Sequence, residues 1–132
     1  MANSIVKQTI LDGSKWLIVK IHIDGDGTGE ETATVLVDAS TYSPAFTNES
    51  LEILHANLTG FTCDLLWDAT ANVVITNIPD YEVHLTPTEI GVGFPNNAGA
   101  GRTGDILFTT SGLGAGDHGT ITLKIKKKGI DT

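Results

Sequence analysis

Cysteine is almost absent from this chain of 132 residues, which contains one, Cys63. A single cysteine excludes any disulfide within the chain, so a hydrophobic core must hold the fold together. Cys63 lies in the segment Thr62-Cys63-Asp64-Leu65, where polar and apolar residues alternate as they do in a half-buried strand. Cysteine at such a position usually acts as a small buried apolar group. We therefore expect a core side chain and not a reactive thiol.

Basic residues are also scarce. Eight Lys and Arg stand against sixteen Asp and Glu, which gives a formal net charge of −8. This charge opposes association with nucleic acid or anionic lipid, so we expect neither nucleic acid nor a membrane as a partner. Three of the basic residues form the run Lys126-Lys127-Lys128 at the end of a predicted strand. Lysines on an edge strand commonly block edge pairing, and the alternative for this run is a docking patch for an acidic protein surface.

Long apolar runs are missing as well. No stretch approaches the ~18 residues that span a bilayer, and the first eight residues lack the basic start and apolar run of a signal peptide. We therefore expect a protein that is made and kept in solution. A chain of 132 residues fits a single core, so we expect one β-sandwich domain over residues 1–132.

Apolar residues instead alternate with polar ones along most of the chain. The clearest case is Leu17–Ile23, with an apolar residue at every second position, as in a strand with one buried face. Similar patterns predict strands over residues 33–37, 63–67, 81–85, 106–110 and 121–125. Turn residues and many of the fifteen glycines separate these segments. Short strands with this punctuation predict an all-β fold, an antiparallel β-sandwich that is jelly-roll-like.

Three local predictions accompany this fold class. The strands on either side of the glycine-rich link 25–29 are expected to form a hairpin with a long loop. The strands on either side of Ser111–Asp117 are expected to be joined by a turn. The segment from Leu51 to Leu58 also fits a short helix, but we favour a strand because its neighbours are strands, with a turn over residues 57–60.

The acidic segment Asp24–Glu31 resembles the front of a calcium loop, with oxygen ligands at alternate positions and glycines between them. An EF-hand requires a bidentate glutamate at the twelfth position, where this chain has Val35, and helices where this chain has predicted strands. The segment is therefore not an EF-hand. A looser cation site and a solvated acidic loop both stay open.

Chemistry-bearing motifs are otherwise lacking. The four histidines are scattered singly, without the close pair that is typical of a metal site. No Gly-x-Ser-x-Gly elbow or comparable nucleophile context is present. We therefore predict no catalytic, cofactor-binding or metal-binding residue, and we expect that the protein is not an enzyme.

The two tryptophans differ in strand parity. Trp67 shares the parity of Cys63, which predicts a core position. Trp16 shares the parity of Lys20 and therefore faces solvent or a partner. A stacking platform for sugar rings is the alternative function for such side chains.

Four segments together resemble a group of small structural proteins of tailed bacteriophages: Thr62–Thr70, Gly91–Gly99, Gly104–Thr110 and Asp117–Lys128. The resemblance covers about half of the chain. It implies a jelly-roll-like virion component of the capsid decoration or cement type, bound to the outside of the shell and assembled in the bacterial host cytoplasm. The shared motifs are structural, so no catalytic or binding residue is transferred.

This resemblance implies the major capsid protein as partner. A homo-oligomer, most plausibly a trimer, would match capsid symmetry. Loops 41–49 and 94–103 are natural docking elements, because loops on a rigid scaffold commonly carry contacts. With Trp16, the apolar side chains of these loops form the predicted interface: Tyr42, Pro44, Phe46, Phe94 and Pro95.

Two other functions stay open. A carbohydrate- or receptor-binding module of a phage tail or head fibre would use Trp16 and the acidic loop with a cation. An enzyme of the cupin or jelly-roll type would need at least three of five side chains to converge in a cavity: His22, His55, His84, Glu52 and Glu82.

Overall fold

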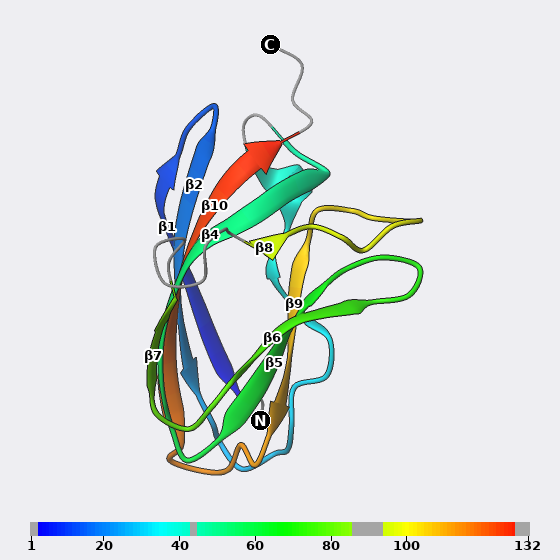
Figure 1. Cartoon of the computed structure of the whole chain (residues 1–132). Helices are drawn as coiled ribbons and strands as arrows, with labels where there is room; N and C mark the ends of the chain where they lie inside the picture. The colour runs from blue at the N-terminus through cyan, green and yellow to red at the C-terminus, as the bar shows by residue number, and fades with distance from the viewer. Residues whose placement is uncertain (1–2, 43–44, 86–93, 129–132) are drawn as a thin grey trace.

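Two antiparallel sheets stack face to face in the computed structural model, which describes residues 3–42, 45–85 and 94–128 (Figure 1). The larger sheet has the strand order β1-β2-β10-β4-β7, with β8 also paired to β4, and the smaller sheet has the order β3-β9-β5-β6. The strands are β1 (Ser4–Asp12), β2 (Trp16–Asp24), β3 (Thr34–Val37), β4 (Asn48–Thr59), β5 (Thr62–Trp67), β6 (Val73–Ile78), β7 (Glu82–Leu85), β8 (Phe94–Pro95), β9 (Ile106–Ser111) and β10 (His118–Lys128). One short 3-10 helix, η1 (Ala39–Thr41), follows β3.

The strand pairing is that of a jelly roll. Four antiparallel pairs are nested along the chain: β2 with β10, β3 with β9, β4 with β7, and β5 with β6. Successive pairs alternate between the two sheets, which gives the stacked antiparallel sheets of this fold. The predicted all-β, jelly-roll-like sandwich is therefore confirmed.

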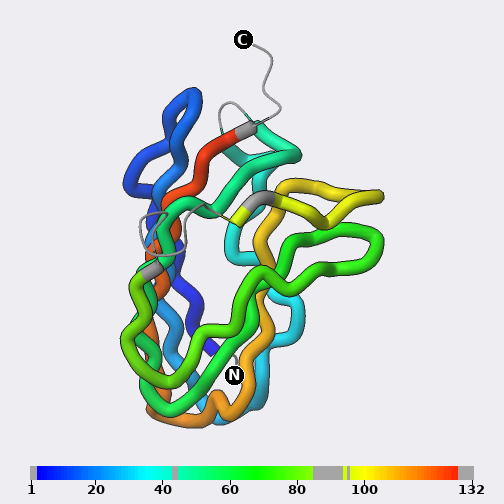
Figure 2. Tube along the Cα trace, in the orientation of Figure 1, coloured from blue at the N-terminus to red at the C-terminus, as the bar shows by residue number. Residues whose placement is uncertain are grey.

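Both hairpin-like connections predicted from the sequence cross between the sheets instead. β2 pairs with β1 and β10, whereas β3 pairs with β9, so the expected β2–β3 hairpin is wrong. The β9–β10 link likewise joins strands of different sheets. Alternation identifies a strand but not its neighbours, and these long links are able to span the ~10 Å between stacked sheets. The two crossings run side by side at one end of the molecule (Figure 2).

The inner faces of the two sheets form one core. Every second residue of β2 and of β10 is buried, as the alternation predicts, and Trp67 and Cys63 on β5 are each 1% exposed. Both were predicted to be core side chains, and both predictions are confirmed. Burial raises the pKa of the Cys63 thiol to about 12, so this cysteine is an apolar filler.

The other strand predictions have mixed outcomes. The ambiguous segment around Leu51 is strand β4, as favoured, but the strand continues through Thr59, beyond the predicted start of the turn. β10 is a central strand between β2 and β4, so its lysines do not protect an edge. The side chain of Lys127 is 0% exposed and its Nζ donates to Asp12 Oδ1 at 2.7 Å. Within the described residues, no helix is long and apolar enough to cross a membrane.

Candidate functional site

The two loops predicted to dock a partner meet at one end of the sandwich, called here the loop end (residues 38–42, 45–47 and 95–105). A hollow of about 320 Å³ lies between them. Its lining comes from both loops: Ser40, Ala45, Phe46, Thr47 and Thr103. The loops are in close contact, because a Cβ atom on Gly104 would lie 2.7 Å from the carbonyl oxygen of Phe46. Sequence reasoning identified both loops, whereas their proximity is decided by the jelly-roll connectivity.

The hydrogen bonds of the loop end hold both loops in place. The backbone N–H of Ala39 donates to Asp105 Oδ1 at 2.8 Å, which ties η1 to the start of β9. Thr103 Oγ1 donates to Asp68 Oδ2 at 2.8 Å, which ties the second loop to the β5–β6 turn. Burial raises the pKa of Asp105. The hollow therefore lies between anchored walls.

The predicted interface side chains of the first loop point mostly inward. Phe46 is 4% exposed and belongs to the core, which corrects the expectation that it offers apolar surface to a partner. Tyr42 is half-buried and stacks on Phe46, with the ring centroids 6.4 Å apart. Burial raises the pKa of Tyr42. Pro44 lies outside the described residues. The sequence pattern did not predict the burial of Phe46, because residues 42–46 show no strand-like alternation.

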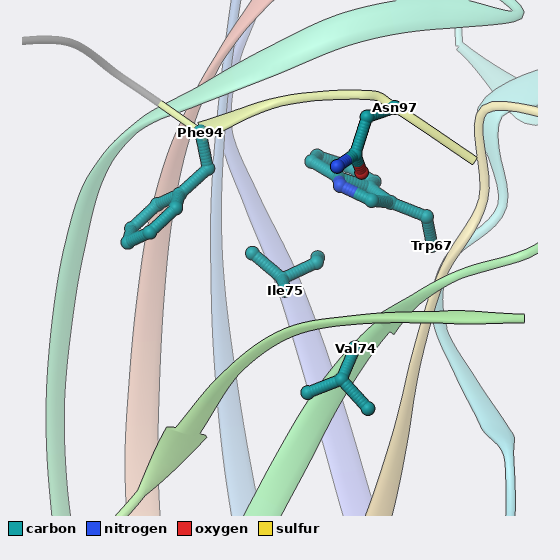
Figure 3. A pocket seen from close by; sticks show the side chains of 5 residues that line it. All are labelled: Trp67, Val74, Ile75, Phe94 and Asn97. Atoms are coloured by element: carbon teal, nitrogen blue, oxygen red, sulfur yellow. The ribbon is translucent and has the colours of Figure 1, made fainter.

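Phe94 and Pro95, from the second loop, form β8 and pair with Leu51 and Ser50 of β4. Phe94 is half-buried and lines a different, smaller hollow of about 90 Å³ between β8 and β6 (Figure 3). The other lining residues are Trp67, Val74, Ile75 and Asn97. Figure 3 shows the Asn97 amide over the Trp67 ring and Phe94 on the far side of Ile75. The structure therefore separates Phe94 from the hollow at the loop end.

A buried carboxyl group lies behind the loop end. The side chain of Glu49 is 0% exposed, and its Oε1 accepts a hydrogen bond from Asn96 Nδ2 at 2.9 Å. Its Oε2 is buried without a hydrogen-bond partner. Burial raises the pKa of Glu49 to about 7, although the Asn96 hydrogen bond and the Arg102 charge oppose the shift. Sequence reasoning missed this group, because a glutamate in register with Lys127 on a neighbouring strand is recognisable only once the strands are paired.

The acidic segment Asp24–Glu31 lies at the opposite end, called here the glycine end (residues 25–33 and 112–117). Glu30 Oε1 accepts from Thr110 Oγ1 at 2.7 Å and from Leu113 N at 3.1 Å, and Oε2 accepts from Gly112 N at 2.8 Å. Asp26 Oδ1 accepts both the N–H and the hydroxyl of Thr28. These hydrogen bonds lower the pKa of Glu30 and of Asp26. The carboxylates thus organise the two crossing links.

The outward face of the larger sheet is called here the outer face. Trp16 is half-buried on it, as its parity predicts, with Lys124 Nζ 4.7 Å from the ring centroid. Sequence reasoning missed the exposed apolar side chains of β1: Val6 is 58% exposed, Ile10 54% and Leu11 45%. Within β1 only Ile5 is partly buried, and a β-bulge between Thr9 and Leu11 shifts the register, so this strand shows no two-residue period in the sequence.

All four histidines also lie on the outer face: His22, His55, His84 and His118. His55 and His84 are cross-strand neighbours with ring centroids 5.5 Å apart, and His55 Nε2 lies 3.0 Å from Glu82 Oε2. Three of the five side chains required for the enzyme hypothesis thus meet, but on an exposed sheet face and not in a cavity. Among the described residues, no group of three or more His, Cys, Asp or Glu is placed to hold a metal ion.

No protein-family model matches the chain, and no curated protein matches it. Among solved structures, the chain is similar to a mutant of the family 29 carbohydrate-binding module CBM29-2, at 10% identity and a TM-score of 0.40, over 93% of this chain and 92% of that one. It is also similar to a cupin superfamily protein from Desulfitobacterium hafniense DCB-2, at 11% identity and a TM-score of 0.31, over 99% of this chain and 82% of that one. At TM-scores this low, neither likeness bears on function.

Proposed function

We propose that this protein is a non-catalytic structural component of a tailed-bacteriophage virion, a decoration protein that binds the outer surface of the capsid. The observation that carries the proposal is the meeting of two anchored loops around the hollow of about 320 Å³ at the loop end. A rigid sandwich that presents adjacent loops at one end is suited to dock on a repeating lattice, where many weak contacts add up. Residues 62–128 resemble small structural proteins of tailed bacteriophages, and we therefore take the repeating lattice to be a capsid shell.

The docking contact is formed by the walls of the hollow and not by large aromatic anchors. Ser40, Ala45, Thr47 and Thr103 are exposed, whereas Phe46 forms the buried floor. A projecting loop or side chain of the major capsid protein enters between the walls. The proposed location is the capsid exterior, reached after assembly in the bacterial cytoplasm.

The test is binding of purified protein to purified capsid shells of a phage that carries the gene, measured by co-sedimentation and then by cryo-EM. We expect stoichiometric copies at regular positions with the loop end against the shell. Ala45→Arg places a bulky cation at the hollow and abolishes co-sedimentation. Ala115 is an exposed alanine at the glycine end, so Ala115→Arg is the matched control and is expected to leave co-sedimentation unchanged. Density with both loops free in solvent on an occupied shell would overturn the docking mode.

A carbohydrate- or receptor-binding module of a tail or head fibre is the second candidate, and the half-buried Trp16 on an open sheet face favours it. An indole ring at a protein surface is a common platform for a sugar ring, and Lys124 Nζ lies over one face of this ring. A glycan array separates the two functions. Binding that is lost in Trp16→Ala, together with a few copies at a fibre tip in cryo-EM, would replace decoration by receptor binding. Loss of that binding on addition of EDTA would assign a cation to it.

A further inference from the structure

A row of apolar side chains, interrupted by Lys124, crosses the outer face near the β1–β2 turn. Leu11 on β1 pairs with Ile18 on β2, Ile18 pairs with Lys124 on β10, and Lys124 pairs with Ile53 on β4. Directly opposed residues of an antiparallel sheet lie on the same face. Trp16 extends this row along β2, and the exposed Ile10 lies next to Leu11 at the bulge of β1. These apolar residues are called here the apolar band: Ile10, Leu11, Trp16, Ile18 and Ile53.

The band also extends across the middle of the sheet. Lys124 Nζ lies 4.7 Å from the Trp16 ring centroid, so the methylene stem of this lysine, which starts on β10 between β2 and β4, leans toward β2 and packs against the Trp16 ring. Ile10 and Leu11 are among the most exposed large apolar side chains of the described residues, at 54% and 45%. Exposed apolar groups that are contiguous mark an interaction surface, whereas single ones do not.

The edge of β1 itself is protected against strand addition. Lys7 points away from the outer face, and its Nζ donates to the carbonyl oxygen of Val35 in the other sheet at 2.8 Å. The bulge between Thr9 and Leu11 further distorts the edge. Inward-pointing charges and bulges are the devices by which natural sheets prevent edge pairing. A partner therefore meets the face of this sheet and not its edge.

The charge of the outer face differs from that of the rest of the chain. Among the side chains that the structure describes on this face, three lysines, Lys20, Lys124 and Lys126, balance three carboxylates, Asp24, Glu52 and Glu82, in a chain of net charge −8. Two of the carboxylates already lie against histidines: His22 Nε2 is 3.1 Å from Asp24 Oδ2, and His55 Nε2 is 3.0 Å from Glu82 Oε2. The excess negative charge therefore belongs to the remaining surface, which repels a second copy of the chain.

We propose that a second copy of this chain covers the apolar band, in a two-fold, face-to-face contact between the larger sheets. Five strands at a spacing of about 4.8 Å and a length of about 30 Å offer on the order of 700 Å², close to the ~800 Å² that each partner buries in a standard interface. A contact of one face with itself is isologous and closes as a dimer, in place of the trimer expected from capsid symmetry. This proposal does not rest on the proposed function, because it uses the outer face and not the loop end.

Sedimentation equilibrium from 1 to about 200 µM tests the proposal, and the wild-type chain is expected to be a dimer at the upper concentrations. Leu11→Glu places a charge in the band and is expected to weaken dimerisation at least tenfold. Val74→Glu is the matched control, because Val74 is 55% exposed on β6 of the other sheet. Raising NaCl from 50 to 500 mM is expected to leave dimerisation equal or stronger, since salt screens the repulsion between two acidic chains.

A second variant covers the case in which Leu11→Glu fails to fold. Thr122 lies at the centre of the outer face on β10, and the only native cysteine is buried. Thr122→Cys under mild oxidation is expected to give a disulfide-linked dimer, whereas Ala115→Cys at the glycine end is not.

Three results would overturn the proposal: a wild-type chain that stays monomeric throughout, a dimer that Leu11→Glu leaves intact, or a trimer. A monomer whose capsid binding is lost in Leu11→Glu but kept in Ala45→Arg would assign the apolar band to the shell protein. Failure of the proposed function, in contrast, is recognised by unimpaired dimers that do not bind shells.

Discussion

The two ends of the sandwich use carboxylates in opposite ways. At the glycine end, Glu30 is exposed and accepts three hydrogen bonds, one from Thr110 of β9 and two from the link that follows β9, which lower its pKa. At the loop end, Glu49 is 0% exposed, has one side-chain partner and an orphan Oε2, and its pKa is raised to about 7. Water and several donors favour the charged form, whereas burial favours the protonated form. The same residue type therefore stabilises one end best when ionised and the other best when neutral.

The largest expected effect comes from adding a side chain to the glycine at each end where two backbone segments are in close contact. A Cβ atom on Gly25 would lie 2.3 Å from the carbonyl oxygen of Gly114, and one on Gly104 would lie 2.7 Å from that of Phe46. Gly25→Ala and Gly104→Ala are each expected to lower the free energy of unfolding by about 3 kcal/mol or more, because backbone must move. Urea unfolding measures this.

The control for these two variants is Gly99→Ala. Gly99 has a φ of +82°, and a Cβ atom added to it would meet no other atom within 4 Å. Its substitution therefore costs the left-handed conformation alone, about 1 kcal/mol. An equal loss in all three variants would show that close approach of the backbone is not what holds the ends together.

The buried Lys127 is expected to have the next largest effect. Asp12→Asn leaves the fully buried ammonium group of Lys127 without the carboxylate oxygen that lies 2.7 Å from its Nζ, which is expected to cost about 3 kcal/mol. Asp24→Asn, at an exposed carboxylate of β2, is the control, with an expected change below about 0.5 kcal/mol. Thermal unfolding of both variants at one pH makes the comparison, and similar melting temperatures would contradict it.

The raised pKa of Glu49 predicts a stability that falls with rising pH. Its folded-state pKa of about 7 exceeds the ordinary value of 4.5, so its contribution is complete below pH 4.5 and is lost as the pH rises through 7. Glu49→Gln removes this loss and is expected to be more stable than wild type at pH 9, by up to about 3 kcal/mol. The two proteins converge near pH 5. Parallel urea curves at both pH values measure the difference, and a constant difference would refute it.

The smallest effect is expected at Glu30, with the opposite sign. A lowered pKa means that its stabilisation is present above the ordinary value and is lost as the pH falls through the lowered one. Because the side chain is exposed, Glu30→Gln is expected to cost only about 1 kcal/mol at pH 7 and nothing at low pH. Chemical denaturation at pH 7 and at pH 3 checks this, and a loss that grows on acidification would contradict it.

Much of the fold was predictable because a half-buried strand imposes a two-residue period on its own sequence. This period identified β2, β10 and the core positions of Cys63 and Trp67. It failed at β1, an edge strand in which only Ile5 is partly buried and a bulge shifts the register between Thr9 and Leu11. It also could not separate a hairpin from a crossing between sheets, because both begin and end with the same alternation.

The candidate sites were less predictable for the same reason. Loops 41–49 and 94–103 were expected to dock a partner, and residues of both loops line one hollow in the structure. The side chain of Phe46, however, points into the core. The apolar side chain of a loop gains more from burial than from exposure whenever the fold offers it space. The apolar band consists of residues on three strands, and no local pattern in the chain unites them.

The sequence by itself determined the fold class, the position of most strands and the side of each strand that faces the core, because these depend on residues only two positions apart. The tertiary structure alone decided which strands are neighbours, that Lys127 and Glu49 are buried, and that four scattered histidines share one face. These properties depend on contacts between residues far apart in the chain. Such contacts exist only once the nested pairs of the jelly roll have closed.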